Sequence, residues 1–277
     1  MIFSKRVLVL LLSICITSQA IAQYSDDDGG IETESGYLRS VEFAAGATYQ
    51  NLLDQAISPV LYTNIGPIFR LSNLKISKTN YSEVNIQASS MWLKKKTNEL
   101  LESGVKTQRA LLDYRFLFKM PVESRAFDIR AGGMLSAMFA HKKAPYLQDA
   151  ATIYEYAVSL GISGKITKEI TLFDKTSFLS WDVSIPIVAN FSRPAYLNLI
   201  QKADPEVKPV GEFLDNATTG LVGKYLRLNS RAYVLVRLDN GNAVKLGYQW
   251  DYSRIKSKYN KVYFAEHSVF LAFMFNY

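Results

Sequence analysis

Cysteine, histidine and long apolar runs are almost missing from this chain of 277 residues. Its one cysteine, Cys15, lies inside the N-terminal export signal described below, so no disulfide, thiol nucleophile or thiolate metal site is expected after export. His141 and His267 are the two histidines, too few for an ordinary transition-metal site. No apolar run of about twenty residues follows the N-terminus, which excludes a later transmembrane helix. We therefore expect no cofactor and no metal.

Residues 1–22 have the layout of an export signal. Two basic residues give it a positive start, an apolar stretch follows, and Ala20-Ile21-Ala22 forms a small-x-small cleavage site. The exported chain is therefore expected to begin directly after this site. Segment 23–35 then carries five acidic residues and no basic residue, which predicts a solvated tail in the periplasm.

The last twelve residues, Glu266 to Tyr277, have the alternation of a β-strand. Counting back from the C-terminus, every second residue is apolar, and the residues between them are mixed. A strand points alternate side chains to opposite faces, so one face here is wholly apolar. Such a face suits either the core of a soluble sandwich or the lipid side of a membrane barrel. We predict a membrane-insertion signal formed by Val269, Leu271, Phe273, Phe275 and Tyr277.

Residues 36–277 repeat this alternation in about ten stretches, joined in turn by short turns and longer loops. The pattern predicts a single all-β domain, an antiparallel transmembrane β-barrel of about ten strands. Eight or twelve strands remain open, because the segments 51–83 and 192–232 are ambiguous. An even number of strands would place both ends of the barrel on the periplasmic side.

Four local features add detail to the predicted barrel. Asn240-Gly241 predicts a tight hairpin, because this pair supplies the positive φ that such a turn requires. Gly164 to Glu169 is expected to be the turn between the sixth and seventh strands. Pro67 lies inside the second strand, where we expect a bulge because proline has no amide to donate. The seventh strand is expected to point outward the side chains of Trp181, Val183, Ile185, Ile187, Ala189 and Phe191.

The opposite faces of these strands carry charged residues of both signs. In a narrow barrel such side chains pair across the interior and fill it, which predicts a plug. The functional alternative is the charged constriction of a narrow pore for ions or small solutes. The candidate interior charges are Asp113, Arg115, Asp128, Arg130, Asp182, Lys245, Asp251 and Glu266.

Basic residues collect in the loops that would face outward, near 51–58, 94–108, 141–150, 192–216 and 256–261. The full chain has a formal net charge of +7, but an exported protein meets no nucleic acid, so anionic lipid is the expected partner. Lipopolysaccharide carries phosphate groups that lysines would neutralise. The candidate lipopolysaccharide contacts are Lys94, Lys95, Lys96, Lys142, Lys143, Lys256 and Lys258.

No catalytic set is recognisable in the sequence. The Asp-x-His element of omptin-type barrel proteases does not occur. His267 and Ser268 are adjacent, so a strand would point them to opposite faces and they could not act on one substrate together. His141 lies beside two lysines, where loop solvation explains it. We therefore expect no enzymatic activity, and a barrel hydrolase is the weakest alternative.

Three C-terminal features carry a family resemblance: Leu238-Asp-Asn-Gly-Asn242, Leu246-Gly-Tyr-Gln-Trp-Asp-Tyr252 and the terminal Phe275-Asn-Tyr277. Together they resemble uncharacterised outer-membrane β-barrels of Bacteroidota. The resemblance covers residues 229–277 and is only architectural elsewhere. It implies an outer-membrane location and a barrel fold, and it implies no catalytic residues.

The expected function is that of a non-catalytic outer-membrane barrel, which either supports another outer-membrane assembly or stabilises the membrane. The reasons are a closed-looking interior, the lack of a catalytic set and one long outer loop, 192–216. Besides lipid, the expected partners are the outer-membrane insertion machinery and another outer-membrane protein bound through that loop. A narrow pore is the main alternative.

Overall fold

A computed structural model of the chain describes residues 38–95, 104–122, 127–146, 152–193, 217–256 and 260–277. Within these residues, no helix is long and apolar enough to cross a bilayer. The predicted export signal and acidic tail lie outside the described residues. The strands are β1 (Leu38–Asp54), β2 (Leu61–Ile76), β3 (Asn80–Lys95), β4 (Gly104–Lys119), β5 (Asp128–Lys143), β6 (Thr152–Leu172), β7 (Lys175–Ser192), β8 (Ala217–Leu221), β9 (Tyr225–Arg237), β10 (Ala243–Lys256) and β11 (Lys261–Asn276).

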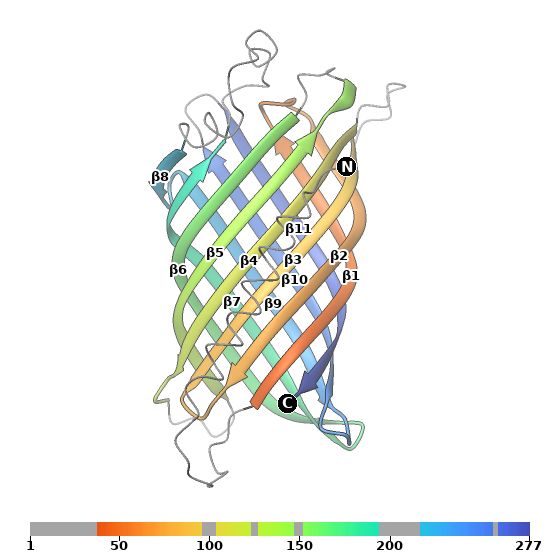
Figure 1. The fold of residues 1–277 in the computed structure, drawn as a ribbon, viewed down its shortest axis with the longest axis vertical. Coiled ribbons are helices and arrows are strands. Elements are labelled where there is room, and N and C mark those ends of the chain that lie inside the picture. Colours follow the sequence, from red (N-terminus) through yellow and green to blue (C-terminus); the bar gives the residue numbers. More distant parts are fainter. Residues whose placement is uncertain (1–37, 96–103, 123–126, 147–151, 194–216, 257–259) are drawn as a thin grey trace. The chain divides into compact units, whose positions relative to one another are not determined.

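The strands form one closed antiparallel barrel (Figure 1). Strands β1 to β7 each pair with the next, as do β9 to β11, and the ring closes between β11 and β1. The two strands β8 and β9 pair with successive parts of β7 and share one position in the ring. The wall therefore has ten strand positions, which confirms the predicted fold class and strand number.

The start of β1 and the end of β11 lie at one rim, the lower rim in Figure 1. Ser40 pairs with Asn276, and the amide of Tyr277 donates to the carbonyl oxygen of Arg39 at 3.0 Å. Three of the four connections at this rim are turns of five residues or fewer, whereas the upper rim carries the long connection between β7 and β8. An even number of strand positions requires the first and the last strand end to lie at the same rim.

The predicted Asn-Gly hairpin joins β9 to β10 at the lower rim. Gly241 has a φ of 82°, which a residue with a Cβ rarely adopts. Its amide donates to the carbonyl oxygen of Leu238 at 3.1 Å. The amide of Leu238 in turn donates to the carbonyl oxygen of Asn242 at 2.9 Å. This hairpin sets the register in which β10 reaches the C-terminal strand.

The prediction of a turn from Gly164 to Glu169 is wrong. Strand β6 continues to Leu172, and the chain turns at Phe173 and Asp174, with φ values of 54° and 58°. The glycine lies in the middle of the wall and is paired on both sides. The long pairing of β6 with β5 and β7 outweighs the local turn signal, because every residue added to it gains backbone hydrogen bonds.

Pro67 is accommodated in β2 without the predicted bulge. It faces Ala47 of β1, and β2 keeps one register with β1 along its whole length. On the other side, pairing of β2 with β3 stops after Thr63 and resumes at Ile68 in the same register. A gap in one ladder therefore replaces the bulge, because it removes the hydrogen bond that proline cannot make.

The outward alternation of β7 changes near its upper end. The register between β6 and β7 shifts at Leu160 and Gly161, where Ile187 is an extra residue. An extra residue exchanges the two faces beyond it. Ala189 and Phe191 consequently point into the barrel, where they are 2% and 3% exposed, and the prediction that they face outward is wrong. Ile187 itself faces outward as predicted.

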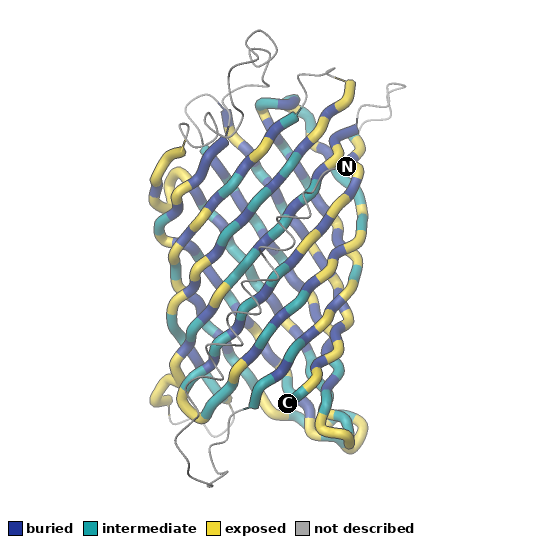
Figure 2. The backbone as a smooth tube through the Cα atoms, viewed as in Figure 1, coloured by how far each residue is buried: buried dark blue, intermediate teal, exposed yellow. Residues whose placement is uncertain are grey.

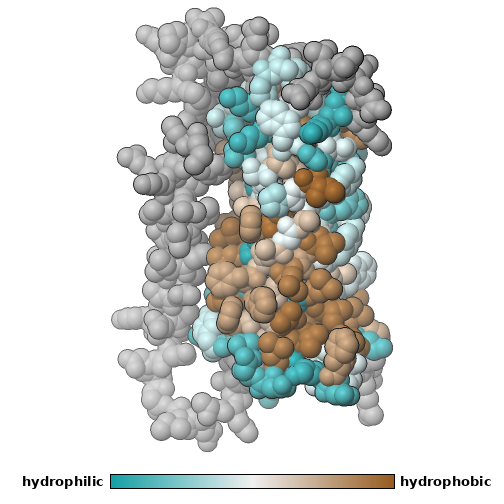
Figure 3. All heavy atoms as spheres, turned by 90° about the vertical axis from the view of Figure 1, so that its right-hand side faces the viewer, coloured by the Kyte–Doolittle hydropathy of each residue, from teal (hydrophilic) through white to brown (hydrophobic). Residues whose placement is uncertain are grey.

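The outer face carries a belt of exposed apolar side chains (Figure 3). All five residues of the predicted insertion signal belong to it, with exposed fractions from 49% for Leu271 to 65% for Tyr277. In Figure 3 the belt covers the lower part of the wall, with hydrophilic residues at the lower rim and a less apolar surface above. An apolar outer band around a closed barrel is the mark of a transmembrane β-barrel.

The wall is taller than a bilayer requires. Apart from β8, the strands have 13 to 21 residues, whereas a tilted crossing takes about 9–11 residues. Because the belt lies toward the lower rim, the surplus lies toward the upper rim (Figure 3). On the face that Figure 3 shows, the upper part of the barrel is therefore expected to stand in water, whereas on β5 the outward apolar side chains continue to Phe139, close to the upper rim.

The interior is layered along the barrel. Buried and exposed positions alternate along the strands, as period two requires (Figure 2). A small apolar group, including Leu74, Leu117 and Met274, lies at the lower rim, and charged residues occupy mid-height. Above them lies the upper apolar cluster, which contains Leu52, Ile57, Tyr62, Met91, Leu93, Val105, Leu111, Met138, Ala144, Ile153, Ala157, Ala189, Phe191, Tyr225, Ile255, Val262 and Phe264.

Candidate functional site

Charged side chains fill the middle of the barrel, and they are the candidate site. Within the described residues, ten basic and seven acidic residues are buried, and Asp113 and Asp128 are half-buried acids beside them. The buried basic residues are Arg70, Arg109, Arg115, Arg130, Lys142, Lys165, Arg193, Arg227, Arg231 and Lys245. The buried acidic residues are Glu42, Asp54, Glu83, Glu155, Asp182, Asp251 and Glu266.

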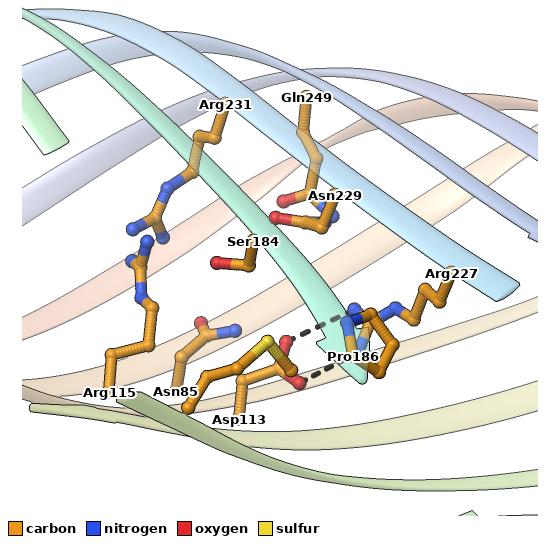
Figure 4. Close-up of a pocket in the computed structure, with 10 residues that line it drawn as sticks. Asn85, Asp113, Arg115, Ser184, Pro186, Arg227, Asn229, Arg231 and Gln249 are labelled. Atoms are coloured by element: carbon orange, nitrogen blue, oxygen red, sulfur yellow. Dashed lines mark hydrogen bonds and ion pairs between the residues drawn. The ribbon is translucent and has the colours of Figure 1, made fainter. Parts of the chain in front are cut away.

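The lower group is built around two carboxylates, Glu83 of β3 and Asp182 of β7. Arg231 of β9 binds both, at 2.9 Å from Glu83 and 2.6 Å from Asp182. Arg115 of β4 contacts the same two carboxylates, with 3.2 Å to Asp182. Lys165 of β6 adds a third cation at 3.0 Å from Asp182. Figure 4 shows the guanidinium groups of Arg115 and Arg231 meeting across the interior. The lower group therefore joins five strands around the ring.

The middle group is centred on Arg227 of β9. Its guanidinium lies 2.8 Å from Asp113 of β4 (Figure 4) and 2.7 Å from Asp251 of β10. Arg109 of β4 lies 3.1 Å from Asp251 and 3.8 Å from Glu266 of β11. Glu266 also accepts hydrogen bonds from two glutamine side chains, at 2.7 and 2.8 Å. These contacts join residues as far apart in the sequence as Gln50 and Glu266.

The mouth cluster consists of Asp54, Lys142, Glu155 and Arg193 at the upper rim. Lys142 lies 2.9 Å from Asp54 and 2.8 Å from Glu155. Arg193 contacts the same two carboxylates, with 2.6 Å to Glu155. Burial raises the pKa of Asp54, but the charges of Lys142 and Arg193 outweigh it and hold that pKa below its ordinary value. Two cations and two carboxylates thus close the upper mouth with matched charge.

Lys142 was predicted to contact lipopolysaccharide, and this prediction is wrong. Strand β5 continues to Lys143 instead of ending before His141. Alternation then turns Lys142 inward between two outward neighbours, where it is 4% exposed. A strand end is set by pairing with β4 and β6, which the local sequence does not reveal.

The other predicted lipid contacts divide into three sets. Lys94 and Lys143 are exposed on the outer face. Lys95 and Lys256 are half-buried at the upper ends of their strands. Lys96 and Lys258 lie outside the described residues, as does the long connection 194–216.

The eight predicted interior charges lie on the inner wall or at its edge. Seven of them belong to the interior, including Lys245, which pairs with Glu42 of β1. Asp128 lies at the lower rim instead, with its side chain 34% exposed and 2.9 Å from Arg130. Among the described residues, the prediction missed eleven further interior charges, and strand alternation could have found those that lie within strands. They are Glu42, Asp54, Arg70, Glu83, Arg109, Lys142, Glu155, Lys165, Arg193, Arg227 and Arg231.

Arg70 differs from the other buried cations, because it has no ion pair with any described residue. It donates to the side-chain oxygens of Gln87 and Gln249, and its Nε and Nη1 have no partner. Its guanidinium carbon lies 4.1 Å from the ring centroid of Phe270. That ring packs over Gly247, where a Cβ would lie 2.2 Å from the ring. A cation–π contact therefore replaces a carboxylate here.

Little space remains between these side chains. One cavity of about 10 Å³ lies among Arg115, Arg227 and Arg231 (Figure 4). Another of about 20 Å³ lies between Arg109 and Lys142. A water molecule needs about 10–15 Å³, so each cavity holds little more than one water. Neither offers room for a substrate or a hydrated ion.

The histidines lie on the outer face, away from the charged interior. His141 Nδ1 lies 3.1 Å from the side-chain oxygen of Gln108, and its ring stacks on Tyr154 at 4.8 Å. His267 Nδ1 lies 2.7 Å from the hydroxyl oxygen of Tyr248. Neither pairs with a carboxylate in the described part of the chain. Within the same residues, no group of three or more His, Cys, Asp or Glu side chains is arranged to hold a metal ion.

No protein-family model and no curated protein matches this chain. Among solved structures, it is similar to the outer membrane protease OmpT from Escherichia coli, with 6% identity, a TM-score of 0.48 and coverage of 90% of this chain and 99% of that one. The translocator domain of autotransporter NalP from Neisseria meningitidis has 7% identity and a TM-score of 0.34, with coverage of 97% of this chain and 98% of that one. The Pseudomonas putida toluene transporter TodX has 7% identity and a TM-score of 0.32, with coverage of 88% of this chain and 90% of that one. These three proteins have different activities, and likenesses this distant transfer none of them.

Proposed function

We propose that this chain is a non-conducting, non-catalytic β-barrel of the bacterial outer membrane. It acts as an accessory subunit of an outer-membrane assembly or as a membrane-stabilising protein. The main support is the filled interior, in which charged side chains from opposite walls bind one another. A barrel closed in this way works through its outer surfaces and loops.

The energetics of the interior favour permanent closure. In the lower group, Glu83 and Asp182 each bind cations from several strands. Removing one partner from a buried pair costs about 3–5 kcal/mol, and opening a channel would separate several pairs together. The upper apolar cluster, which shares the upper end of the barrel with the mouth cluster, adds a second obstruction above the lower and middle groups. Conduction would require both layers to rearrange.

The orientation follows from the two rims. Both barrel ends lie at the lower rim, which we assign to the periplasmic side because the predicted export signal and acidic tail precede β1. The taller upper part then stands outside the cell. A partner protein would meet this part, including the long connection 194–216, and the insertion machinery would recognise the strand that ends at Tyr277.

Single-channel recording of the purified, refolded barrel in a planar bilayer tests the proposal. We expect no conductance steps. Because residues 23–277 contain no cysteine, a Lys261→Cys variant labelled with an impermeant maleimide would verify that silent protein is inserted. Stable, reproducible steps that change in Arg115→Ala or Arg130→Ala would instead establish the narrow pore.

Co-purification distinguishes the two roles within the proposal. After mild detergent extraction from its native membrane, an accessory subunit should retain a stoichiometric outer-membrane partner. A variant lacking 196–214 should lose that partner while its barrel still folds. A barrel that always emerges alone would leave membrane stabilisation as the role.

A further inference from the structure

Three lysines lie near one another on the outer face close to the upper rim. Lys94, Lys106 and Lys143 belong to β3, β4 and β5, which are neighbours in the ring (Figure 1). All three side chains are exposed, and Lys106 faces Lys143 directly in the ladder. Directly opposed residues have Cβ atoms about 5 Å apart, and like charges there destabilise a sheet. The fold alone therefore does not account for this basic patch.

The described part of this outer face offers the patch no negative partner. No ion pair involves the three lysines within it, and Glu155 of the neighbouring strand β6 points inward to Lys142 and Arg193. The outward neighbours on β3 to β6 at this height are Ser90, Trp92, Gln108, His141, Thr152 and Tyr154. All of these are neutral or aromatic. Among the described residues, no negative charge on this surface therefore compensates the patch.

Aromatic rings border the patch and fix its shape. The indole of Trp92 lies across Gly104, where a Cβ would come within 1.9 Å of its Nε1. Trp92 also pairs with Lys106 in the ladder, so the ring lies beside that lysine. On the other side, Tyr154 stacks on His141.

The position of the patch along the barrel axis indicates its ligand. On β5 the outward side chains change from Leu135, Ala137 and Phe139 to His141 and Lys143 toward the upper rim. This is the transition from an apolar belt to the headgroup zone of a bilayer. Tryptophan and tyrosine prefer that zone, and lysines there bind anionic headgroups. An ammonium group and a phosphate form charge-assisted hydrogen bonds.

We propose that Lys94, Lys106 and Lys143 form a binding site for the phosphate groups of an outer-leaflet glycolipid, with Trp92 and Tyr154 against its sugar or acyl parts. The site rests on the proposed outer-membrane orientation. It differs from the seven lysines predicted from sequence, because it adds Lys106, omits the inward Lys142 and requires one particular face. Phosphate would supply the charge that allows Lys106 and Lys143 to face each other.

The test uses the refolded full-length barrel in neutral detergent and a Lys106→Gln/Lys143→Gln variant. Lys78→Gln/Lys119→Gln removes the same charge from exposed positions at the lower rim and serves as the control. The probes are diphosphorylated lipid A, dephosphorylated lipid A and inorganic phosphate. Affinity is taken from the ligand-dependent rise of the unfolding temperature, which follows mass action. Native mass spectrometry counts the lipids bound.

We expect diphosphorylated lipid A to raise the unfolding temperature of the wild type and of the control variant. In the patch variant its affinity should fall on the order of tenfold or more. Without lipid, the patch variant should be as stable as the wild type or more stable, because a repulsive pair has been removed. Dephosphorylated lipid A should bind weakly to all three proteins.

Three results would overturn the proposal. Equal binding of diphosphorylated lipid A by the wild type and the patch variant would mean that these lysines do not hold it. Equal effects of lipid A and inorganic phosphate would indicate a free-anion site. A loss of lipid-free stability in the patch variant would mean that the lysines already pair within the chain, for example with Glu99 or Glu102, which lie outside the described residues. Each result is independent of the conductance experiment.

Discussion

The barrel interior is charged at mid-height and apolar beneath the upper rim, although the same strands build both regions. At mid-height, carboxylates such as Asp182 and Asp251 are 0% exposed and bound by arginines. Nearer the upper rim, Leu93 and Ile153 are 0% exposed among other apolar side chains. Outside the wall the order is reversed, with an apolar belt lower down and a less apolar surface above it (Figure 3). The interior thus changes where the surroundings change.

The physical reason is that apolar surface is buried on the outer face in one region and inside the barrel in the other. At belt height, lipid covers the apolar outer face, so the interior is free to be polar. Polar interior residues also enforce register, because a slip of one residue would place arginines and carboxylates in lipid. Above the belt, water meets the outer face, so apolar burial must come from inside, as in a soluble protein. The two regions should therefore respond differently to substitution.

Arg227→Met should have the largest effect. It removes the cation shared by the half-buried Asp113 and the buried Asp251, and breaking a buried pair costs about 3–5 kcal/mol. Urea unfolding of the refolded barrel in detergent micelles would measure the loss. Arg237→Met, at an exposed position of the same strand, is the control and should change little. A cost below about 1 kcal/mol would show that the charged layer is not structural.

Leu93→Ala should destabilise the upper region by about 3 kcal/mol, because it opens a cavity among fully buried apolar side chains. Urea unfolding of the refolded barrel in detergent micelles would measure this loss as well. Leu221→Ala on β8 is the control, since Leu221 is 65% exposed. If the two variants behaved alike, the upper interior would be solvated and the contrast between the two regions would disappear.

Acid should weaken the mouth cluster. The pKa of Asp54 is held below its ordinary value in the folded state, so the stabilisation is complete at neutral pH. It is lost progressively as the pH falls below the unfolded value of about 3.9. Asp54→Asn should be less stable at pH 7 and show a flatter decline between about pH 5 and 2. Parallel pH profiles for the two proteins would contradict this account.

Arg70→Met should have the smallest effect, at most about 1 kcal/mol and of either sign. No carboxylate is left unpaired, and the methionine keeps the contact with Phe270 through its sulfur. The informative quantity is the difference between the losses of unfolding free energy in Arg70→Met and Arg227→Met, measured in the same assay. A loss as large as that of Arg227→Met would mean that the cation itself, rather than its pairing, stabilises the interior.

Strand alternation was sufficient to predict the barrel and the direction of most side chains. Every second residue from Val269 to Tyr277 points outward, because period two is a property of any strand, whatever it pairs with. The interior position of Arg115, Asp182 and Lys245 followed from the same rule. Local turn chemistry also identified Gly241, since few other residues adopt its φ.

Pairing between distant strands decided what the sequence did not reveal. One extra residue, Ile187, which follows Pro186, reversed the direction of Ala189 and Phe191. Lys142 turned inward because β5 continues wherever β4 and β6 offer partners.

By itself, the sequence determined an antiparallel barrel with an apolar outer face and a charged inner face. Only the tertiary structure decided which charges meet, such as Arg227 with Asp113, 114 positions away. It also placed an apolar layer above the charged one and left Lys106 opposite Lys143. The reason is that alternation depends on the backbone of one strand, whereas partners and layers depend on the register and closure of the whole ring.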